Sequence, residues 1–152
     1  MTTIIADLKR KVLVADSRIT TNSNLVQYAA EKLYRAGRSI YGEAGDVENG
    51  LKFRRWVLDG MPKKGRPSFG NSTDDEFSIL ELDKDGIWLW DQTMARQALK
   101  ESEFSIGSGH KIALYAMRVL GKSAEEAIEE AAKIDIHTAG PVQVLHLKEK
   151  DQ

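Results

Sequence analysis

The chain has 152 residues, of which 41% are hydrophobic and 30% are charged, as is typical of one soluble globular domain spanning residues 1–152. The net charge of −1 gives no electrostatic reason to expect a nucleic acid or a membrane as a partner. The lack of cysteine excludes disulfides, a thiolate metal site and a cysteine nucleophile. The first apolar stretch, Ile4–Ala6, is too short for a signal peptide or a membrane span, so a cytoplasmic location is expected.

The first part of the chain predicts four short strands and then a helix. The strands are apolar, β-branched runs separated by turn residues, and they cover Thr2–Asp7, Lys11–Asp16, Lys32–Arg35 and Ser39–Glu43. Within the second strand, Val12–Ala15 is continuously apolar, which is typical of a strand covered on both faces. The polar segment Thr20–Asn24 is predicted to be a turn. Apolar residues at helical spacing then predict a helix that begins at Val47 and finishes at Asp59-Gly60.

The middle of the chain predicts a loop followed by a hairpin. Met61–Asp75 holds two of the three prolines and many polar residues, and it is expected to be a surface loop. Phe77–Leu82 and Ile87–Trp90 flank the turn segment Asp83–Gly86, a pattern that indicates a β-hairpin.

The last part of the chain predicts two helices and a strand. An amphipathic helix runs from about Ile112 to Leu120. Ser123 and Glu126 form a capping-box pattern at the start of the second helix, which extends to about Ile134, and Val142–Leu147 closes the chain as a strand. The order of strands, helix, strands, helix pair and strand indicates an α+β fold, in which packed sheets carry helices on their outer faces.

Thr2 directly follows the initiator methionine. Because threonine is small, methionine aminopeptidase is expected to remove Met1 and leave Thr2 as the free N-terminus, with no longer propeptide. A terminal threonine carries both a nucleophile and a candidate base, since its own α-amine can accept the hydroxyl proton. The unperturbed pKa of an α-amine is about 7.7–8.0, so part of it is neutral near neutral pH.

Several segments, taken in order, resemble the proteasome β subunits and the proteasome-like peptidase of bacterial two-component ATP-dependent proteases. These proteins are N-terminal nucleophile (Ntn) hydrolases, and the resemblance spans Thr2 to about Leu147. The segments that carry it are Thr2-Thr3-Ile4, Asp16-Ser17-Arg18-Ile19-Thr20, Lys32, Ala44-Gly45, Ile106-Gly107-Ser108-Gly109 and Asp135-Ile136-His137-Thr138-Ala139-Gly140-Pro141.

The resemblance implies a four-layer αββα sandwich of two antiparallel sheets flanked by helices. It also implies a threonine peptidase without a cofactor, which acts on polypeptide substrates inside a homo-oligomeric ring. ATP, where it is needed, would be used by a separate ATPase unfoldase. His110, His137 and His146 are not spaced as metal ligands, so no metal is expected.

The same resemblance assigns catalytic roles to residues from the first half of the chain. Thr2 is the nucleophile, Lys32 is a cation beside it, and Asp16 is the acid that pairs with that lysine. Gly45 offers its backbone N–H as the oxyanion hole. From the residues alone, Lys32 could be an edge-strand residue, Asp16 a strand-end cap and Gly45 a plain turn glycine.

The resemblance implies that Ser108, Asp135 and Thr138 form a cluster that hydrogen-bonds the terminal amine. Ser108 could also be the N-cap of the following helix, and Asp135 could be no more than a turn residue.

Three residues are assigned to substrate binding, namely Thr20, Glu43 and Val47. Glu43 falls where the family places the base of the pocket for the side chain that precedes the scissile bond. A carboxylate there would favour lysine or arginine, whereas an ordinary solvated strand residue would have no such effect.

The chain departs from the family pattern at four places. Thr138 stands where serine is common, Ala139 where glycine is common, and Asp46 where a second small residue is usual. Met61–Asp75 replaces a long helix that normally contributes to ring contacts, which leaves the ring size open. Two alternatives therefore remain beside the peptidase, namely an inactive ring-forming scaffold of the same fold and a small-molecule amidase that uses Thr2.

Overall fold

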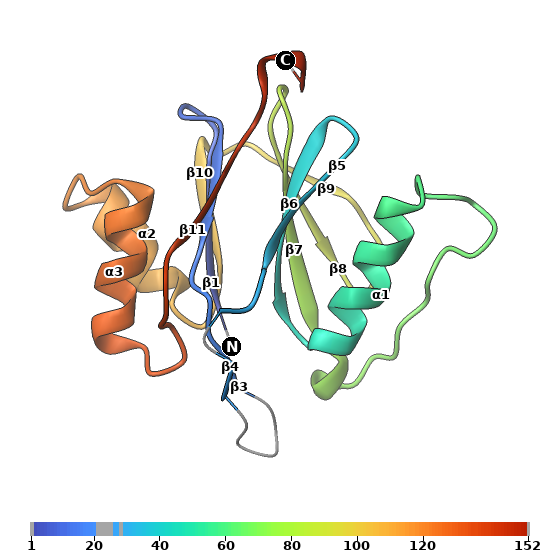
Figure 1. Cartoon of the computed structure of the whole chain (residues 1–152), viewed down its shortest axis with the longest axis horizontal. Coiled ribbons are helices and arrows are strands. Elements are labelled where there is room, and N and C mark those ends of the chain that lie inside the picture. The colour runs from blue at the N-terminus through green and yellow to red at the C-terminus, as the bar shows by residue number, and fades with distance from the viewer. Residues whose placement is uncertain (1, 21–25, 28, 152) are drawn as a thin grey trace.

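Two antiparallel sheets pack face to face in the computed structural model, and helices cover both outer faces (Figure 1). The structure describes residues 2–20, 26–27 and 29–151. One sheet has four strands in the order β10-β1-β2-β11. Its outer face carries α2 (His110–Arg118) and α3 (Ala124–Ile134), and its strands are β1 (Thr3–Asp7), β2 (Val12–Ala15), β10 (Glu103–Gly107) and β11 (Gln143–His146).

The second sheet has five strands in sequence order from β5 to β9. The strands are β5 (Leu33–Ala36), β6 (Ser39–Gly45), β7 (Phe77–Leu82), β8 (Ile87–Asp91) and β9 (Gln97–Leu99). Helix α1 (Val47–Leu58) covers its outer face. The remaining elements are a two-stranded ribbon and two 3₁₀ turns: β3 (Ile19–Thr20), β4 (Val26–Gln27), η1 (Thr73–Asp75) and η2 (Glu149–Asp151).

Successive side chains of a strand point to opposite faces of its sheet, so the apolar residues are divided among three cores. In β2, Leu13 and Ala15 join the core between the two sheets, whereas Val12 and Val14 pack against α2 and α3. The third core lies between the five-stranded sheet and α1 and is built largely from aromatic residues, which are Tyr34, Tyr41, Phe53, Trp56, Phe77 and Trp90. Because helices cover both sheets, the continuous apolar run of β2 is buried on both faces, as predicted.

The helices agree closely with the sequence prediction. Helix α1 begins at the predicted residue and ends at Leu58, directly before the predicted end at Asp59-Gly60, and Asp46 caps its N-terminus. Helix α3 begins with the predicted capping box, in which Ser123 and Glu126 satisfy each other's backbone N–H groups. The segment from Met61 to Asp75 forms a loop that runs along the outer side of α1 and ends in η1 (Figure 1). None of the helices among the described residues combines the length and the apolar character needed to cross a membrane.

The strand predictions need two corrections. The sequence carried no prediction for β9 or β10, and both pair with long neighbouring strands. Thr20 lies in the short strand β3 rather than in a turn, because it pairs with Val26. The rest of the predicted turn, residues 21–24, lies outside the described residues.

The fold brings the start of β1 to the lower end of the sandwich in Figure 1, between the two sheets. Thr3 pairs with Gly107 at the end of β10, and Gly45 at the end of β6 pairs with Phe77. The residues that precede β1 and follow β6 and β10 therefore meet at one end of the molecule.

Candidate active site

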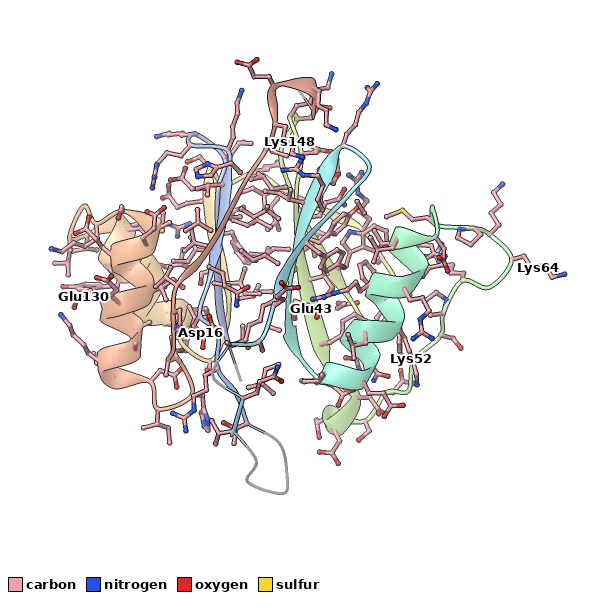
Figure 2. All side chains as sticks on the ribbon, in the orientation of Figure 1. Asp16, Glu43, Lys52, Lys64, Glu130 and Lys148 are labelled. Carbon is pink, nitrogen blue, oxygen red and sulfur yellow. The ribbon has the colours of Figure 1, made fainter. Side chains whose placement is uncertain are left out.

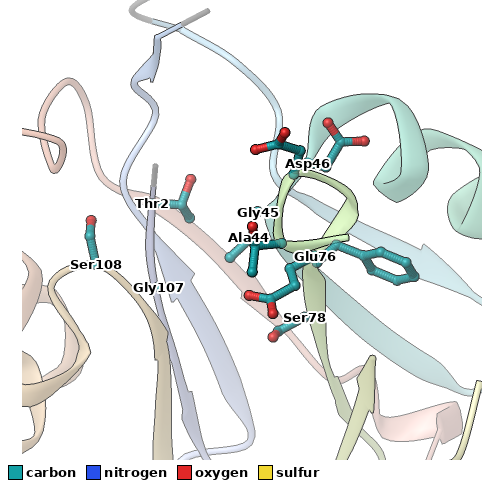
Figure 3. A pocket seen from close by; sticks show the side chains of 11 residues that line it. Thr2, Ala44, Gly45, Asp46, Glu76, Ser78, Gly107 and Ser108 are labelled. Carbon is teal, nitrogen blue, oxygen red and sulfur yellow. The ribbon is translucent and has the colours of Figure 1, made fainter. Parts of the chain in front are cut away.

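Thr2 lies at the meeting point of two cavities. It directly precedes β1 and is only 5% exposed. A cavity of about 370 Å³ lies on one side of it, and a cavity of about 50 Å³ lies on the other. Figure 3 shows Thr2 between Ser108 on one side and Gly45, Asp46 and Glu76 on the other.

Gly107 allows this approach of the chain. Its φ is +94°, and a Cβ at this position would overlap the backbone carbonyl of Thr2. A larger residue would therefore push the start of β1 away from the end of β10.

Lys32 and Asp16 form an ion pair in the interior beside this site. Lys32 Nζ donates to Asp16 Oδ1 at 2.8 Å and to the backbone carbonyl of Arg18 at 2.5 Å. Burial lowers the pKa of the Lys32 ammonium below its ordinary value, although the carboxylate of Asp16 partly offsets that effect. Lys32 lines the smaller cavity together with Thr2, so the fold brings the two predicted residues to one space.

Asp16 also fixes the backbone around the site. Its Oδ1 accepts a hydrogen bond from the N–H of Thr3 at 3.0 Å, and its Oδ2 accepts one from the N–H of Ala139 at 3.1 Å. A single buried carboxylate thus holds β1, the loop after α3 and the Lys32 ammonium in fixed relative positions. In Figure 2, Asp16 lies near the lower end of the four-stranded sheet.

Ser108, Asp135 and Thr138 come together as predicted. Asp135 Oδ2 accepts hydrogen bonds from the hydroxyls of Ser108 at 2.5 Å and Thr138 at 2.6 Å. Burial disfavours the charged carboxyl, but these bonds and the N–H of His137 outweigh it and lower the pKa of Asp135.

Two details of this cluster differ from the sequence interpretation. Ser108 is not the N-cap of α2, because Gly109 occupies that position and the Ser108 hydroxyl donates to Asp135 instead. The sequence interpretation also gave Thr3 no role of its own. Its hydroxyl lies 2.6 Å from that of Thr138, which donates to Asp135, so Thr3 connects β1 to the cluster.

Gly45 lines both cavities, as does the neighbouring Asp46. The φ of Gly45 is +101°, and a Cβ there would lie 2.5 Å from the carbonyl oxygen of Glu76 and 2.7 Å from the Cα of Phe77. Only glycine fits this position. The Asp46 carboxylate accepts a hydrogen bond from the N–H of Asn49 at 2.9 Å, so the charge near the site also caps α1.

The three predicted substrate-binding residues, Thr20, Glu43 and Val47, all line the smaller cavity. Glu43 belongs to β6, and its side chain contacts Arg54 of α1 (Figure 2). Its Oε1 accepts a hydrogen bond from Arg54 Nη2 at 2.7 Å. Burial raises the pKa of Glu43, although the nearby Arg54 acts in the opposite direction. The sequence interpretation placed Arg54 in the helix but gave it no role at the site.

The larger cavity has an acidic wall, of which the sequence interpretation named only Asp46. Asp46, Asp74 and Glu76 line it, and the described residues that line it include no lysine or arginine. Asp74 lies in η1 and Glu76 directly follows it, so the loop that starts at Met61 ends at the site (Figure 3). A search of the sequence for catalytic motifs could not find these residues, because their position depends on the path of that loop.

Known proteins resemble this chain in structure only. No protein-family model matches the sequence, and no curated protein matches it. HslV from Trypanosoma brucei matches with a TM-score of 0.71 at 21% identity, covering 95% of this chain and 99% of that chain. BPH from Thiobacillus denitrificans matches with a TM-score of 0.68 at 20% identity, covering 98% of this chain and 100% of that chain.

A second structure of BPH, in complex with epoxomicin, matches with a TM-score of 0.67 at 17% identity over 97% of this chain and 100% of that chain. These matches span nearly the whole chain, and they confirm the predicted α+β sandwich of two antiparallel sheets flanked by helices. The chain therefore has the fold of the HslV and BPH structures, as its resemblance to the proteasome-like Ntn hydrolases predicts.

Proposed function

We propose that the chain is a threonine-type hydrolase of peptide or amide bonds, with the hydroxyl of Thr2 as its nucleophile. One observation carries the proposal: Thr2 lies where two cavities meet, and the smaller one is also lined by Lys32 and Gly45. The proposal requires that Met1, which lies outside the described residues, is removed so that the α-amine of Thr2 is free.

The reaction proceeds through an acyl-enzyme. The Thr2 oxygen attacks the carbonyl carbon of the substrate while its hydroxyl proton passes to the α-amine. The carbonyl oxygen becomes an oxyanion, which the N–H of Gly45 stabilises. The carbon–nitrogen bond then breaks, and the leaving amine takes the proton from the α-ammonium. Water hydrolyses the remaining ester and regenerates the Thr2 hydroxyl.

The other residues of the site support this sequence of steps. The Lys32 ammonium disfavours an extra proton on the nearby amine and favours a charged oxygen on Thr2. Asp16 holds Lys32 in place through the ion pair of 2.8 Å. The network of Ser108, Asp135 and Thr138 offers hydroxyl groups that can relay a proton beside the start of β1.

Replacement of the nucleophile tests the proposal. Thr2→Ala is expected to lower kcat/KM on a fluorogenic peptide by several orders of magnitude, whereas Thr2→Ser retains part of the activity. Intact-mass spectrometry of the wild type is expected to show loss of Met1 and one adduct on Thr2 after treatment with a β-lactone or epoxyketone. Full turnover by Thr2→Ala would refute the mechanism, and a retained Met1 without any adduct would favour the inactive scaffold.

We further infer that the hydrolase acts on polypeptides as a homo-oligomeric ring. The resemblance to proteasome β subunits motivates this inference, and α1 adds to it because Val47, Leu51 and Leu58 leave apolar surface exposed on the helix. Native mass spectrometry is expected to show one closed oligomer, and a monomer at micromolar concentration would contradict the inference. Degradation of folded proteins would require a separate ATPase unfoldase, whereas cleavage of short peptides would not.

A further inference from the structure

Two residues that line the smaller cavity each carry a buried polar atom without a hydrogen-bond partner among the described residues. The two atoms are the hydroxyl oxygen of Thr20 and the Oε2 atom of Glu43. A buried polar group without a hydrogen bond costs about 1–3 kcal/mol. Both residues line a space that also reaches Thr2, so a substrate group that enters the cavity comes next to them.

Arg54 already neutralises the charge of Glu43. Its guanidinium donates to Glu43 Oε1 at 2.7 Å and to the backbone carbonyl of Glu31 at 2.9 Å, and it stacks on the ring of Tyr34 at 4.5 Å. These contacts hold the guanidinium in one place. A lysine or arginine of the substrate would therefore meet a carboxylate that is already paired, and it would lose hydration without gaining a free counter-ion.

The other charges that line the cavity are also engaged. Lys32 pairs with Asp16, and the carboxylate of Asp46 caps the N-terminus of α1. Of the charges that line the cavity, those of Lys32 and Glu43 are therefore paired, whereas Asp46 remains a carboxylate that accepts a backbone hydrogen bond.

The size of the cavity limits what can enter. Its volume is about 50 Å³, against about 370 Å³ for the larger cavity. The smaller space therefore favours a short side chain. The side chain of asparagine is short, whereas those of lysine, arginine and the aromatic residues are longer or bulkier.

We propose that the pocket next to Thr2 selects a short carboxamide side chain, that of asparagine, in the residue whose carbonyl is attacked. The amide N–H donates to Glu43 Oε2, and the amide oxygen accepts from the hydroxyl of Thr20. Arg54 is the residue that turns the pocket away from the basic specificity expected for Glu43 alone. This inference rests on the proposed function and names the substrate class of the same site.

Four substrates that differ in one residue test the proposal. Peptides with a fluorogenic amide leaving group carry asparagine, leucine, aspartate or lysine at the attacked residue. The side chains of asparagine, leucine and aspartate have the same number of non-hydrogen atoms. We expect kcat/KM to be highest for asparagine, by about tenfold or more over leucine and lysine. A preference for leucine, aspartate or lysine in the wild type would overturn the proposal.

The variant Arg54→Gln tests the role of Arg54 in this specificity. Removal of the guanidinium leaves the charge of Glu43 unpaired, so kcat/KM for lysine is expected to rise relative to asparagine by about tenfold. Arg55→Gln, at an exposed position on the same helix, is the matched control and should keep the wild-type order. An unchanged order in a folded Arg54→Gln variant would contradict the role of Arg54.

Covalent labelling of Thr2 distinguishes a failure of the proposed function from a failure of the proposed specificity. A wild type that neither hydrolyses any of the four peptides nor reacts with a β-lactone would refute the proposed function itself. A wild type that reacts at Thr2 but does not prefer asparagine would refute only the specificity. If Arg54→Gln does not fold, the order of the four substrates in the wild type still decides the proposal.

Discussion

Asp16 and Lys32 form an ion pair of 2.8 Å in which neither side chain is more than 2% exposed. The Asp16 oxygen that binds Lys32 also accepts the backbone N–H of Thr3, the residue that follows Thr2. Removal of two charges from water costs free energy that their attraction offsets only in part. The pair is therefore better explained by the position that it gives Lys32 beside Thr2 than by a contribution to stability.

Asp16→Ala should strongly destabilise the fold. The substitution leaves the Lys32 ammonium buried without its counter-ion, which typically costs about 3–5 kcal/mol. Urea denaturation followed by tryptophan fluorescence measures the free energy of unfolding. Glu48→Ala is the control, since it breaks the exposed pair with Lys52 and is expected to cost less than about 1 kcal/mol. Equal free energies of unfolding for the two variants would contradict the importance of the buried pair.

The activity should depend on pH in two steps. The value of kcat/KM is expected to rise as the α-amine of Thr2 loses its proton, at a pH below the ordinary pKa of about 7.7–8.0, because the Lys32 ammonium disfavours that proton. The value of kcat/KM should then fall at a pH below 10.5, the ordinary pKa of lysine. Burial lowers the pKa of Lys32, so its ammonium loses its proton at a lower pH than an exposed lysine does.

A pH profile of peptide hydrolysis measures both steps. Lys32→Arg keeps a cation that does not titrate in this range, so its profile should lose the alkaline fall, although its rate is expected to be lower. A wild-type profile that stays level beyond the ordinary pKa of lysine would contradict the role assigned to the Lys32 ammonium.

Most of the fold could be predicted from local patterns in the sequence. Strand β2 is apolar throughout because sheets and helices cover both of its faces, and α3 carries its capping box within the sequence. Strand β9 could not be predicted in this way. It has three residues at the edge of its sheet, and two of them are exposed, so its sequence lacks an apolar pattern.

Residues of the candidate site could be predicted only where they belong to segments that follow one another in the same order as in the proteasome-like family. Thr2, Asp16, Lys32 and Gly45 are far apart in the sequence, and their common role follows from the resemblance rather than from their spacing. Arg54 could not be recognised, because its role depends on how α1 packs on β6. The local sequence suggested that Ser108 is the N-cap of α2. In the structure its hydroxyl instead donates a hydrogen bond to Asp135, which is distant in the sequence, and Gly109 is the N-cap.

Gly45→Ala should reduce both stability and activity. The new Cβ would meet backbone atoms of Glu76 and Phe77, which cannot move aside as a flexible side chain can. Gly60→Ala is the matched control, because Gly60 also has a positive φ, of +89°, but a Cβ there meets nothing within 4 Å. Backbone strain alone costs about 1–3 kcal/mol, so the difference between the two variants isolates the steric effect at Gly45.

Denaturation and peptide hydrolysis are both measured for these two variants. Gly60→Ala should keep the wild-type kcat/KM, since Gly60 lies at the end of α1 and lines neither cavity at Thr2. Gly45 would not be the predicted oxyanion-hole residue if Gly45→Ala were as active as Gly60→Ala.

The acidic wall of the larger cavity should favour basic substrates. Asp46, Asp74 and Glu76 line about 370 Å³ of space next to Thr2, and carboxylates of one sign around a cleft attract cations over several ångströms. The double variant Asp74→Asn and Glu76→Gln is expected to lower kcat/KM by about three- to tenfold for peptides with lysine or arginine beside the attacked residue. Neutral peptides of the same length should be cleaved as fast as by the wild type.

Salt provides an independent measurement of the same effect. Because exposed charges are screened over about 10 Å at 0.1 M salt, added sodium chloride should slow the cleavage of basic peptides by the wild type and affect the double variant less. The pair Glu101→Gln and Glu129→Gln removes two exposed carboxylates that do not line the cavity, and it serves as the control for net charge. If this pair reduced the cleavage of basic peptides as much as the double variant does, the effect would come from total charge and not from the wall of the cavity.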